Sequence, residues 1–205
     1  MGNEGDLRTG GAQWMRAASG VIHSEMPRQS DGLMRGFQLW INLPAAEKMG
    51  DPAYQELSPE AIPEVQRDGA AVRVLAGAFG DVRGPIDDPG TGLQYLDVDL
   101  RPGWAFRHAL DEELTAFVNV FEGDAQVAGQ PLPLHHLGVL GGGDGVEVEA
   151  GADGTRFILV AGRPLKEPIV QHGPFVMNTR EEIEQALTDY RDGTLVRRRA
   201  AVTAA

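Results

Sequence analysis

Short stretches of alternating apolar and polar residues fill the middle of this sequence. Four of them alternate at a period of two, at 72–76, 96–100, 116–121 and 146–149. This period places successive side chains on opposite faces of a β-strand. A fifth stretch, 156–161, is almost continuously apolar and predicts a buried strand that Gly162 closes. Short strands separated by turn residues about every ten positions are typical of a β-sandwich or barrel.

The N-terminal part of the chain carries a similar pattern. Residues 12–15 and 20–26 predict two short strands on either side of a small-residue turn at 17–20. Residues 37–42 alternate between two sets of side chains and predict a third strand, which Pro44 follows. We therefore expect three short strands in this part of the chain.

The segment 45–70 differs from its surroundings. It has little periodicity, several charges and three prolines, Pro52, Pro59 and Pro63. Such a composition is typical of a connection and not of a core strand. We therefore predict that 45–70 is a connector between two domains.

One helix is predicted near the C-terminus. Thr179 and Glu182 have the spacing of a capping box, in which the side chain of each residue accepts a hydrogen bond from the backbone N–H of the other. The apolar positions that follow fall on one helical face: Ile183, Ala186, Leu187 and Tyr190. Gly193 supplies the stop signal. The fold class is therefore mainly β with a late helix that docks on a barrel, and the tail after the arginines at 197–199 is expected to be frayed and solvated.

Composition and charge narrow the function. The chain has 205 residues, a formal net charge of −12 and no cysteine. An acidic chain repels phosphate backbones, so direct nucleic-acid binding is not expected. The absence of cysteine excludes a disulfide framework and fits a reducing compartment. No apolar run approaches the roughly 18 residues of a membrane span, and the polar start does not look like a secretory signal. We expect a cytoplasmic protein with no membrane partner.

The candidate chemistry lies at His23-Ser24-Glu25. In a strand, residues two apart project to the same face, so an imidazole and a carboxylate would point the same way. These donors suit a divalent first-row metal such as iron, manganese or zinc. Three or four ligands are usual, however, and the pair alone does not separate a metal site from a hydrogen-bonded structural histidine.

The remaining histidines come late in the chain, at positions 108, 135, 136 and 172. On a strand, adjacent His135 and His136 would point to opposite faces. We interpret His108, His135 and His136 as structural or solvated, and His172 as part of a turn before Gly173.

Three separate stretches resemble the motifs of the pirin family, in the order in which that family carries them. They lie at 13–27, which includes His23-Ser24-Glu25, at 36–44 (GFQLWINLP), and at 162–179, with Gly162-Arg163-Pro164-Leu165 and Gly173-Pro174-Phe175. The resemblance covers essentially the whole chain. It implies a double cupin, two β-barrels of which only the N-terminal one holds a metal.

The resemblance also implies a ligand set. Pirins typically hold iron by three histidines and one glutamate, and His23 and Glu25 match the last two of these ligands. The other two histidines belong to a His-x-His strand that would lie upstream of Met1. The segment around His108 resembles the first cupin motif of the second barrel, where Leu110 stands in place of a second histidine.

From this resemblance we expect a specific domain organisation. Residues 1–44 would be the remainder of an N-terminal barrel, 45–70 a connector, 71–165 the C-terminal barrel, and 166–205 a segment with the docking helix and tail. A first barrel without its beginning would expose strand edges, so we expect this region to be poorly stable or to borrow a strand from a neighbour.

The resemblance implies a pirin-like metal-binding protein related to the iron-dependent quercetin 2,3-dioxygenases, which would take a flavonol-like small molecule. Fe(II) would be the cofactor, His23 and Glu25 would be metal ligands, and Glu25 would also exchange protons with the substrate. With two of the four usual ligands missing, metal affinity is expected to fall by orders of magnitude. The alternative is a non-catalytic regulatory module that binds a protein partner through its acidic surface.

Overall fold

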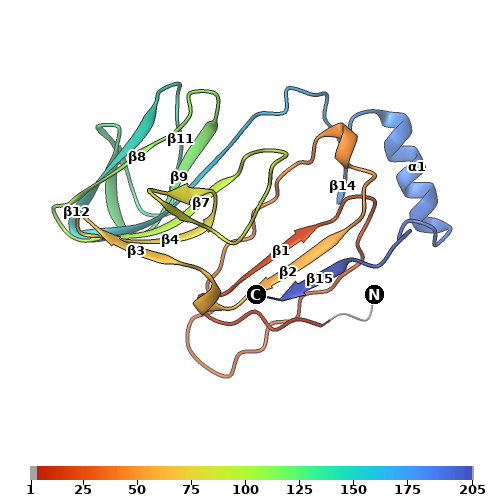
Figure 1. The fold of residues 1–205 in the computed structure, drawn as a ribbon, viewed down its shortest axis with the longest axis horizontal. Helices are drawn as coiled ribbons and strands as arrows, with labels where there is room; N and C mark the ends of the chain where they lie inside the picture. The colour runs from red at the N-terminus through yellow and green to blue at the C-terminus, as the bar shows by residue number, and fades with distance from the viewer. Residues whose placement is uncertain (1–3, 205) are drawn as a thin grey trace. The chain divides into compact units, whose positions relative to one another are not determined.

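The computed structural model describes residues 4–204 and is mainly β (Figure 1). Its strands are β1 (Ala12–Arg16), β2 (Ala53–Leu57), β3 (Glu64–Arg67), β4 (Ala70–Ala76), β5 (Ala78–Phe79), β6 (Val82–Arg83), β7 (Gln94–Leu100), β8 (Ala105–Ala109), β9 (Thr115–Val127), β10 (Gln130–Leu132), β11 (Leu137–Val139), β12 (Gly145–Gly162), β13 (Val170–His172), β14 (Phe175–Met177) and β15 (Ala201–Ala204). Within the same range, its helices are α1 (Arg180–Arg191) and the short 3-10 helices η1 (Ala45–Glu47) and η2 (Pro59–Ala61). The predicted fold class is confirmed.

The described chain forms two compact units that interleave in sequence. The first unit takes residues 4–6, 13–56 and 166–204, and the second takes 7–12 and 57–165. The segment predicted as a connector, 45–70, thus supplies η1 and most of β2 to the first unit and β3 to the second.

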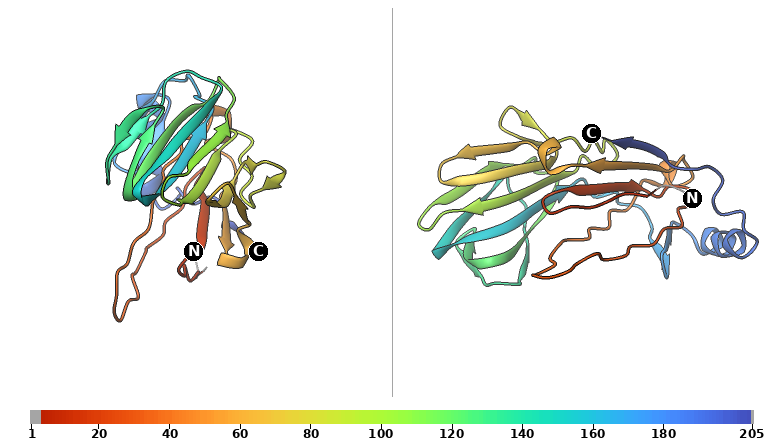
Figure 2. Two further views of the ribbon diagram at one scale, coloured as in Figure 1. Left: turned by 90° about the vertical axis from the view of Figure 1, so that its left-hand side faces the viewer. Right: turned by 90° about the horizontal axis from the view of Figure 1, so that it is seen from below.

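The second unit is built on an eight-stranded sheet. Its main order is β10-β9-β12-β7-β4-β3, with β11 also paired to β9 and β8 to β12. All of these pairings are antiparallel, and the 18-residue strand β12 pairs with β7, β8 and β9. Figure 2 shows the sheet curling as it crosses this unit. The four alternating stretches and the apolar stretch 156–161 all lie in strands of this sheet, which confirms those predictions.

The apolar core of the second unit fills the inner face of this sheet. Burial alternates residue by residue along β4, where Val72 and Val74 are fully buried. Phe157 of β12 is fully buried and meets Phe106 edge to face, with ring centroids 5.5 Å apart. Aliphatic and aromatic side chains from β4, β7, β9 and β12 make up most of the cluster. Burial of this apolar area is what holds the short strands together.

Charged side chains occupy the other face of the same strands. Asp97 of β7 lies 3.6 Å from the Arg73 guanidinium of β4, and Arg156 of β12 contacts Asp99 and Glu122. Burial raises the pKa of the Asp97 carboxyl, although Arg156 and Arg73 oppose the shift. The alternation predicted from the sequence therefore separates an apolar face from a salt-bridged one.

The first unit contains a three-stranded sheet of order β1-β2-β15. β15 pairs in parallel with β2, with Ala201 opposite Ala53. The prediction of a frayed tail is therefore wrong for these residues, because their backbone N–H and C=O groups pair with those of β2. Arg198, just before β15, lies 2.9 Å from Asp51.

Helix α1 and the β13–β14 hairpin complete the first unit. Thr179 accepts a hydrogen bond from the backbone N–H of Glu182, and the Glu182 carboxylate accepts one from the backbone N–H of Thr179, so the predicted capping box is confirmed. The helix packs against β14 and β13 and buries Ile183. Tyr190 meets Phe175 of β14 edge to face at 6.2 Å.

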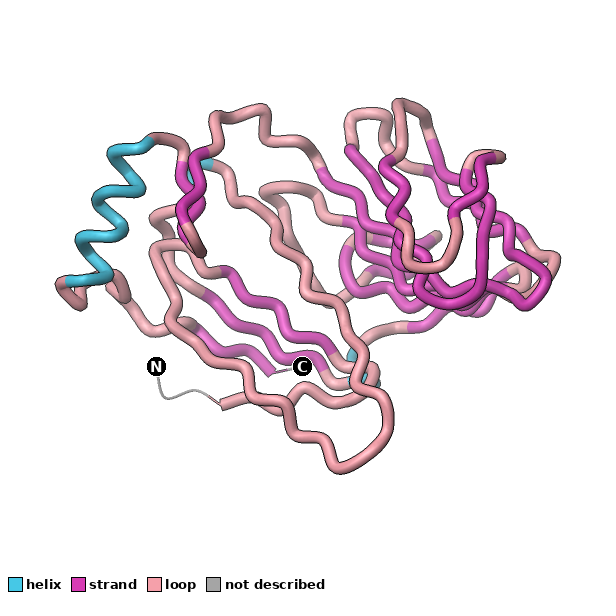
Figure 3. The backbone as a smooth tube through the Cα atoms, turned by 180° about the vertical axis from the view of Figure 1, so that it is seen from behind, coloured by secondary structure: helices cyan, strands magenta, loops and turns pink. Residues whose placement is uncertain are grey.

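Residues 20–44, the 20–44 loop below, contain no helix or strand. Figure 3 shows them as one continuous loop trace. The strands predicted at 20–26 and 37–42 are therefore wrong. Alternation indicates that a segment fits a pleated surface, but a strand also needs a neighbour that completes its hydrogen-bond ladder.

Candidate metal centre

The predicted ligands His23 and Glu25 both lie in the 20–44 loop of the first unit. The imidazole Nδ1 of His23 is 3.9 Å from a carboxylate oxygen of Glu25. Their side chains are 45% and 65% exposed, respectively. The two donors therefore lie next to each other and are open to solvent, although they do not sit on the strand that the sequence predicted.

Contacts around this pair are sparse. The Gln38 side-chain amide donates to a Glu25 carboxylate oxygen at 3.4 Å, which is a long hydrogen bond. This contact joins the two arms of the loop. A single weak donor leaves most of the acceptor capacity of the Glu25 carboxylate available to a ligand.

The donor types fit a first-row divalent metal, but the donor number does not. Imidazole and carboxylate are common ligands of iron, manganese and zinc, which usually take three or more protein donors. Among residues 4–204, no group of three or more His, Cys, Asp or Glu side chains lies close enough together to hold a metal ion. Among the described residues, His23 and Glu25 therefore supply two adjacent donors, fewer than a metal ion usually takes.

The first unit contains a buried lysine that the sequence did not predict. Lys48, in the segment predicted as a connector, is only 5% exposed. Its ammonium donates to the Asn42 side-chain carbonyl and to the backbone carbonyl of Val176 at 2.9 Å. Burial lowers the pKa of Lys48, while the nearby carboxylates of Glu167 and Glu182 oppose this shift.

Lys48 belongs to a polar cluster that joins distant parts of the sequence. The Glu167 carboxylate accepts hydrogen bonds from the Ala45 backbone N–H at 2.8 Å and the Asn178 side chain at 3.1 Å. The cluster thus ties the end of the 20–44 loop and η1 to the segment before α1. No local motif marks Lys48, because apart from Asn42 the groups that surround its ammonium, at Val176, Glu167 and Glu182, come from more than 100 residues further along the chain.

The other histidines lie outside any candidate site. His108 of β8 packs against Phe79 at 5.5 Å, and its Nε2 is buried with no hydrogen-bond partner among the described residues. His135 and His136 lie in the turn after β10 and not on a strand, and His135 has a positive φ of 63°. His172 ends β13 at a hairpin turn. The structural or solvated interpretation thus agrees with where these residues lie.

Acid should weaken the second unit through His108. Burial lowers the pKa of this imidazole below its usual 6.5, so the unfolded chain takes up a proton before the folded chain does. Stability contributed by the neutral ring is complete above about pH 6.5 and is lost as pH falls below it. We expect His108→Leu to reduce the loss of thermal stability between pH 7.5 and 5.5, measured by circular dichroism. The matched control is His136→Leu at an exposed position, and an equal reduction in both variants would contradict the assignment.

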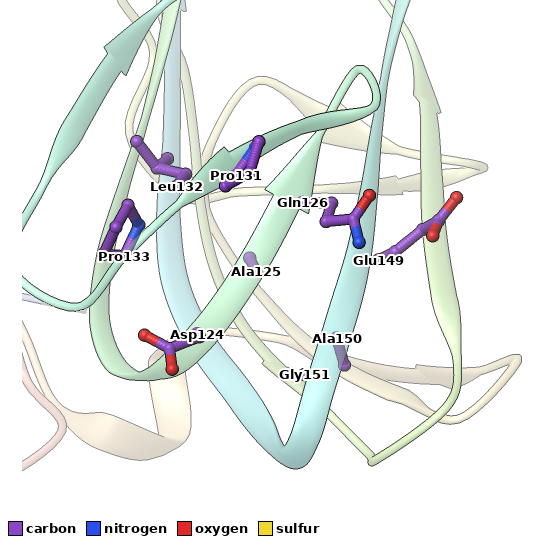
Figure 4. A pocket seen from close by; sticks show the side chains of 9 residues that line it. All are labelled: Asp124, Ala125, Gln126, Pro131, Leu132, Pro133, Glu149, Ala150 and Gly151. Atoms are coloured by element: carbon purple, nitrogen blue, oxygen red, sulfur yellow. The ribbon is translucent and has the colours of Figure 1, made fainter.

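The described part of the second unit has a shallow pocket. It has a volume of about 370 Å³ and lies where β9, β10 and the first half of β12 meet. Figure 4 shows its walls, with Pro131, Leu132 and Pro133 on one side and the carboxylates of Asp124 and Glu149 at its edges. Asp124 already accepts a hydrogen bond from the Leu134 backbone N–H at 3.1 Å. The pocket contains neither candidate metal ligand.

No helix in the described part of the chain is long and apolar enough to cross a membrane.

Two family models match the chain. The model described as the pirin C-terminal cupin domain matches residues 95–196, and the model described as pirin matches residues 1–41. The second match contains His23 and Glu25.

The similar proteins include pirins and quercetin 2,3-dioxygenases. A putative quercetin 2,3-dioxygenase of Pseudomonas aeruginosa is 44% identical over 203 residues, a match covering 95% of this chain and 71% of the relative. Human pirin is 42% identical over 196 residues, covering 93% of this chain and 67% of the relative. The crystal structure of a quercetin 2,3-dioxygenase from Acinetobacter baumannii matches with a TM-score of 0.72 and 32% identity. That match covers 76% of this chain and 55% of the solved chain.

Proposed function

Because this chain belongs to the pirin family, we propose that it is a metal-binding relative of the quercetin 2,3-dioxygenases, with His23 and Glu25 as its metal ligands. The observation that supports this most is the match to the Pseudomonas protein, which extends over nearly the whole chain. The exposed, adjacent imidazole and carboxylate are the donors that such a centre requires.

The proposed substrate is a flavonol-like molecule, the class named by the relatives. Fe(II) is the proposed cofactor, and it would supply Lewis acidity. Because the described residues provide two donors, the active form needs further donors from outside this set. The two ligands that are present have suitable chemistry, but more ligands are needed.

Glu25 is also the proposed acid–base group. Its carboxylate is exposed and accepts one long hydrogen bond from Gln38, so it is accessible to a phenolic hydroxyl. A carboxylate held near the reacting hydroxyl takes its proton and returns it to the product, a role that typically contributes about 100- to 10,000-fold in rate.

Oxygen consumption tests this proposal directly. The chain is loaded anaerobically with Fe(II), quercetin is added, and dissolved oxygen is followed after mixing with buffer at known oxygen concentration. We expect quercetin-dependent oxygen uptake that falls about 100-fold or more in Glu25→Gln. Asp31→Asn, a carboxylate change in the same loop, serves as the control and should leave the rate unchanged. Equal rates in Glu25→Gln and the unaltered chain would refute the role of Glu25, and no uptake at any Fe(II) concentration would refute the activity.

A further inference from the structure

The shallow pocket between β9, β10 and β12 combines an apolar wall with acidic edges (Figure 4). Pro131, Leu132 and Pro133 form the wall. The carboxylates of Asp124 and Glu149 come from two different strands at the rim. The volume of about 370 Å³ lies near the lower end of the range for ligand pockets, roughly 300–1,000 Å³. The pocket therefore suits a single long side chain better than a large cofactor.

The two carboxylates of the pocket have no cation beside them. Within the described part of the chain, neither Asp124 nor Glu149 takes part in an ion pair, and no arginine or lysine lines the pocket. Arg107 of β8, a strand that pairs with the same half of β12, already contacts Glu147. The pocket therefore carries two uncompensated negative charges.

The charge of the whole second unit acts in the same direction. Residues 7–12 and 57–165 contain 17 carboxylates, eight arginines and no lysine, so the formal net charge of this unit is 8 − 17 = −9, out of −12 for the chain. Such a field attracts cations and repels nucleic acids and other acidic surfaces. A cationic occupant is therefore favoured, and a second copy of this acidic unit is not.

Two prolines restrict how an occupant can bind at this place. β10 lies at the end of its sheet and, among the described strands, pairs with β9 alone. An extended chain can add to such an edge through backbone hydrogen bonds. Pro131 and Pro133 have no N–H, however, so β10 offers few donors to an added strand. The contact therefore has to be made mainly by side chains that enter the pocket.

Arginine is the side chain that matches this combination of groups. Its guanidinium holds several N–H donors in one plane and pairs with carboxylates in a defined geometry. Its flat face and its methylene groups also pack on apolar surface, which the rings of Pro131 and Pro133 provide here. The ammonium of lysine is a compact, strongly hydrated charge and gains less from such a wall.

We propose that this pocket is a docking site for an arginine-containing segment of another protein. Asp124 and Glu149 accept hydrogen bonds from the guanidinium, and the proline wall covers its flat face. Oδ1 of Asp124 keeps its hydrogen bond from the Leu134 backbone N–H, and Oδ2 is left for the guanidinium. The site lies within the second unit and needs no metal, so this inference goes beyond the proposed function and does not depend on it.

Fluorescence anisotropy on the full 205-residue chain tests the site, with the labelled peptide Gly-Ser-Arg-Ser-Arg-Ser-Gly as the probe, in about 0.15 M salt with a chelator. We expect saturable binding that Asp124→Asn and Glu149→Gln together weaken about tenfold, because two exposed ion pairs are lost. Asparagine retains an oxygen for the Leu134 N–H. The matched control, Glu112→Gln with Asp144→Asn, removes two exposed carboxylates of the same unit outside the pocket and should change the affinity by less than about twofold.

Two further comparisons separate the pocket from general attraction to an acidic surface. The same peptide with lysine at both arginine positions should bind about threefold more weakly or worse. Gln126→Trp fills the pocket from β9 without a change of charge and should remove saturable binding. Circular dichroism shows that each variant is folded.

Four results would overturn this docking site. They are an absence of saturable binding up to about 1 mM peptide, equal weakening by the pocket and control substitutions, equal affinity for the arginine and lysine peptides, and unchanged binding in Gln126→Trp. All of the variants leave His23 and Glu25 in place, so failure of the docking site is distinguishable from failure of the proposed function, which oxygen uptake tests.

Discussion

Replacing Phe157 by alanine should lower the free energy of unfolding of the second unit by about 3–5 kcal/mol. The side chain is fully buried in β12, where Phe157 is paired with Val98 of β7 on one side and with Val120 of β9 on the other. Its ring meets Phe106 edge to face. Truncation removes the buried apolar area and leaves a cavity between strands that cannot collapse without breaking their ladders.

Urea unfolding followed by tryptophan fluorescence and circular dichroism measures this loss. The matched control is Val139→Ala in β11, at a side chain that is 70% exposed, where we expect a change within about 0.5 kcal/mol. A loss of less than about 1 kcal/mol for Phe157→Ala would mean that this ring is not at the centre of the core.

Replacing Lys48 by methionine should destabilise the first unit by about 1–3 kcal/mol. Methionine keeps nearly the same side-chain length but has no N–H donors. The Asn42 side-chain carbonyl and the Val176 backbone carbonyl, which accept from Lys48 in the folded chain, would lose this donor in a partly buried position. The buried Lys48 ammonium would also no longer face the Glu167 and Glu182 carboxylates.

Hydrogen exchange resolves this prediction by region. Amides of α1 and of β14 should exchange faster in Lys48→Met, because the cluster holds the segment before the helix, while amides of β9 and β12 in the second unit should not change. Lys166→Met, at an exposed lysine, is the control. Faster exchange in β9 and β12 alone would contradict the assignment of Lys48 to the first unit.

The two stability predictions need no metal ion, unlike the oxygen-uptake experiment. Phe157 and Lys48 act within one folded unit each. The proposed role of His23 and Glu25 depends on further donors that the described residues do not bring together. Measurements of stability alone therefore cannot replace the measurement of oxygen uptake.

The candidate site could be found from the sequence only in part. The His23-Ser24-Glu25 motif was recognisable, and its two side chains do lie within 3.9 Å of each other. The reason expected for this proximity, a shared strand face, is wrong, because the loop that carries them has no strand partner. The backbones of residues two apart are always close, but it is the conformation of this loop that brings the two side chains together.

The sequence by itself determined the features that depend on neighbouring residues. The capping box of Thr179 and Glu182 joins groups three positions apart, and the alternating burial of β4 and β7 follows from the period of two. Each of these patterns is complete within a short window of the chain.

Only the tertiary structure decided the features that need a partner far away in sequence. Residues 37–42 alternate well and yet form no strand, while the small-residue tail 201–204 forms one because β2 accepts it. Lys48 is buried because carbonyls and carboxylates from distant segments surround it. The physical reason is the same in each case. A β-strand or a buried charge is stable only when a hydrogen-bonding or charged partner is present, and the sequence pattern of one segment does not show whether another segment supplies that partner.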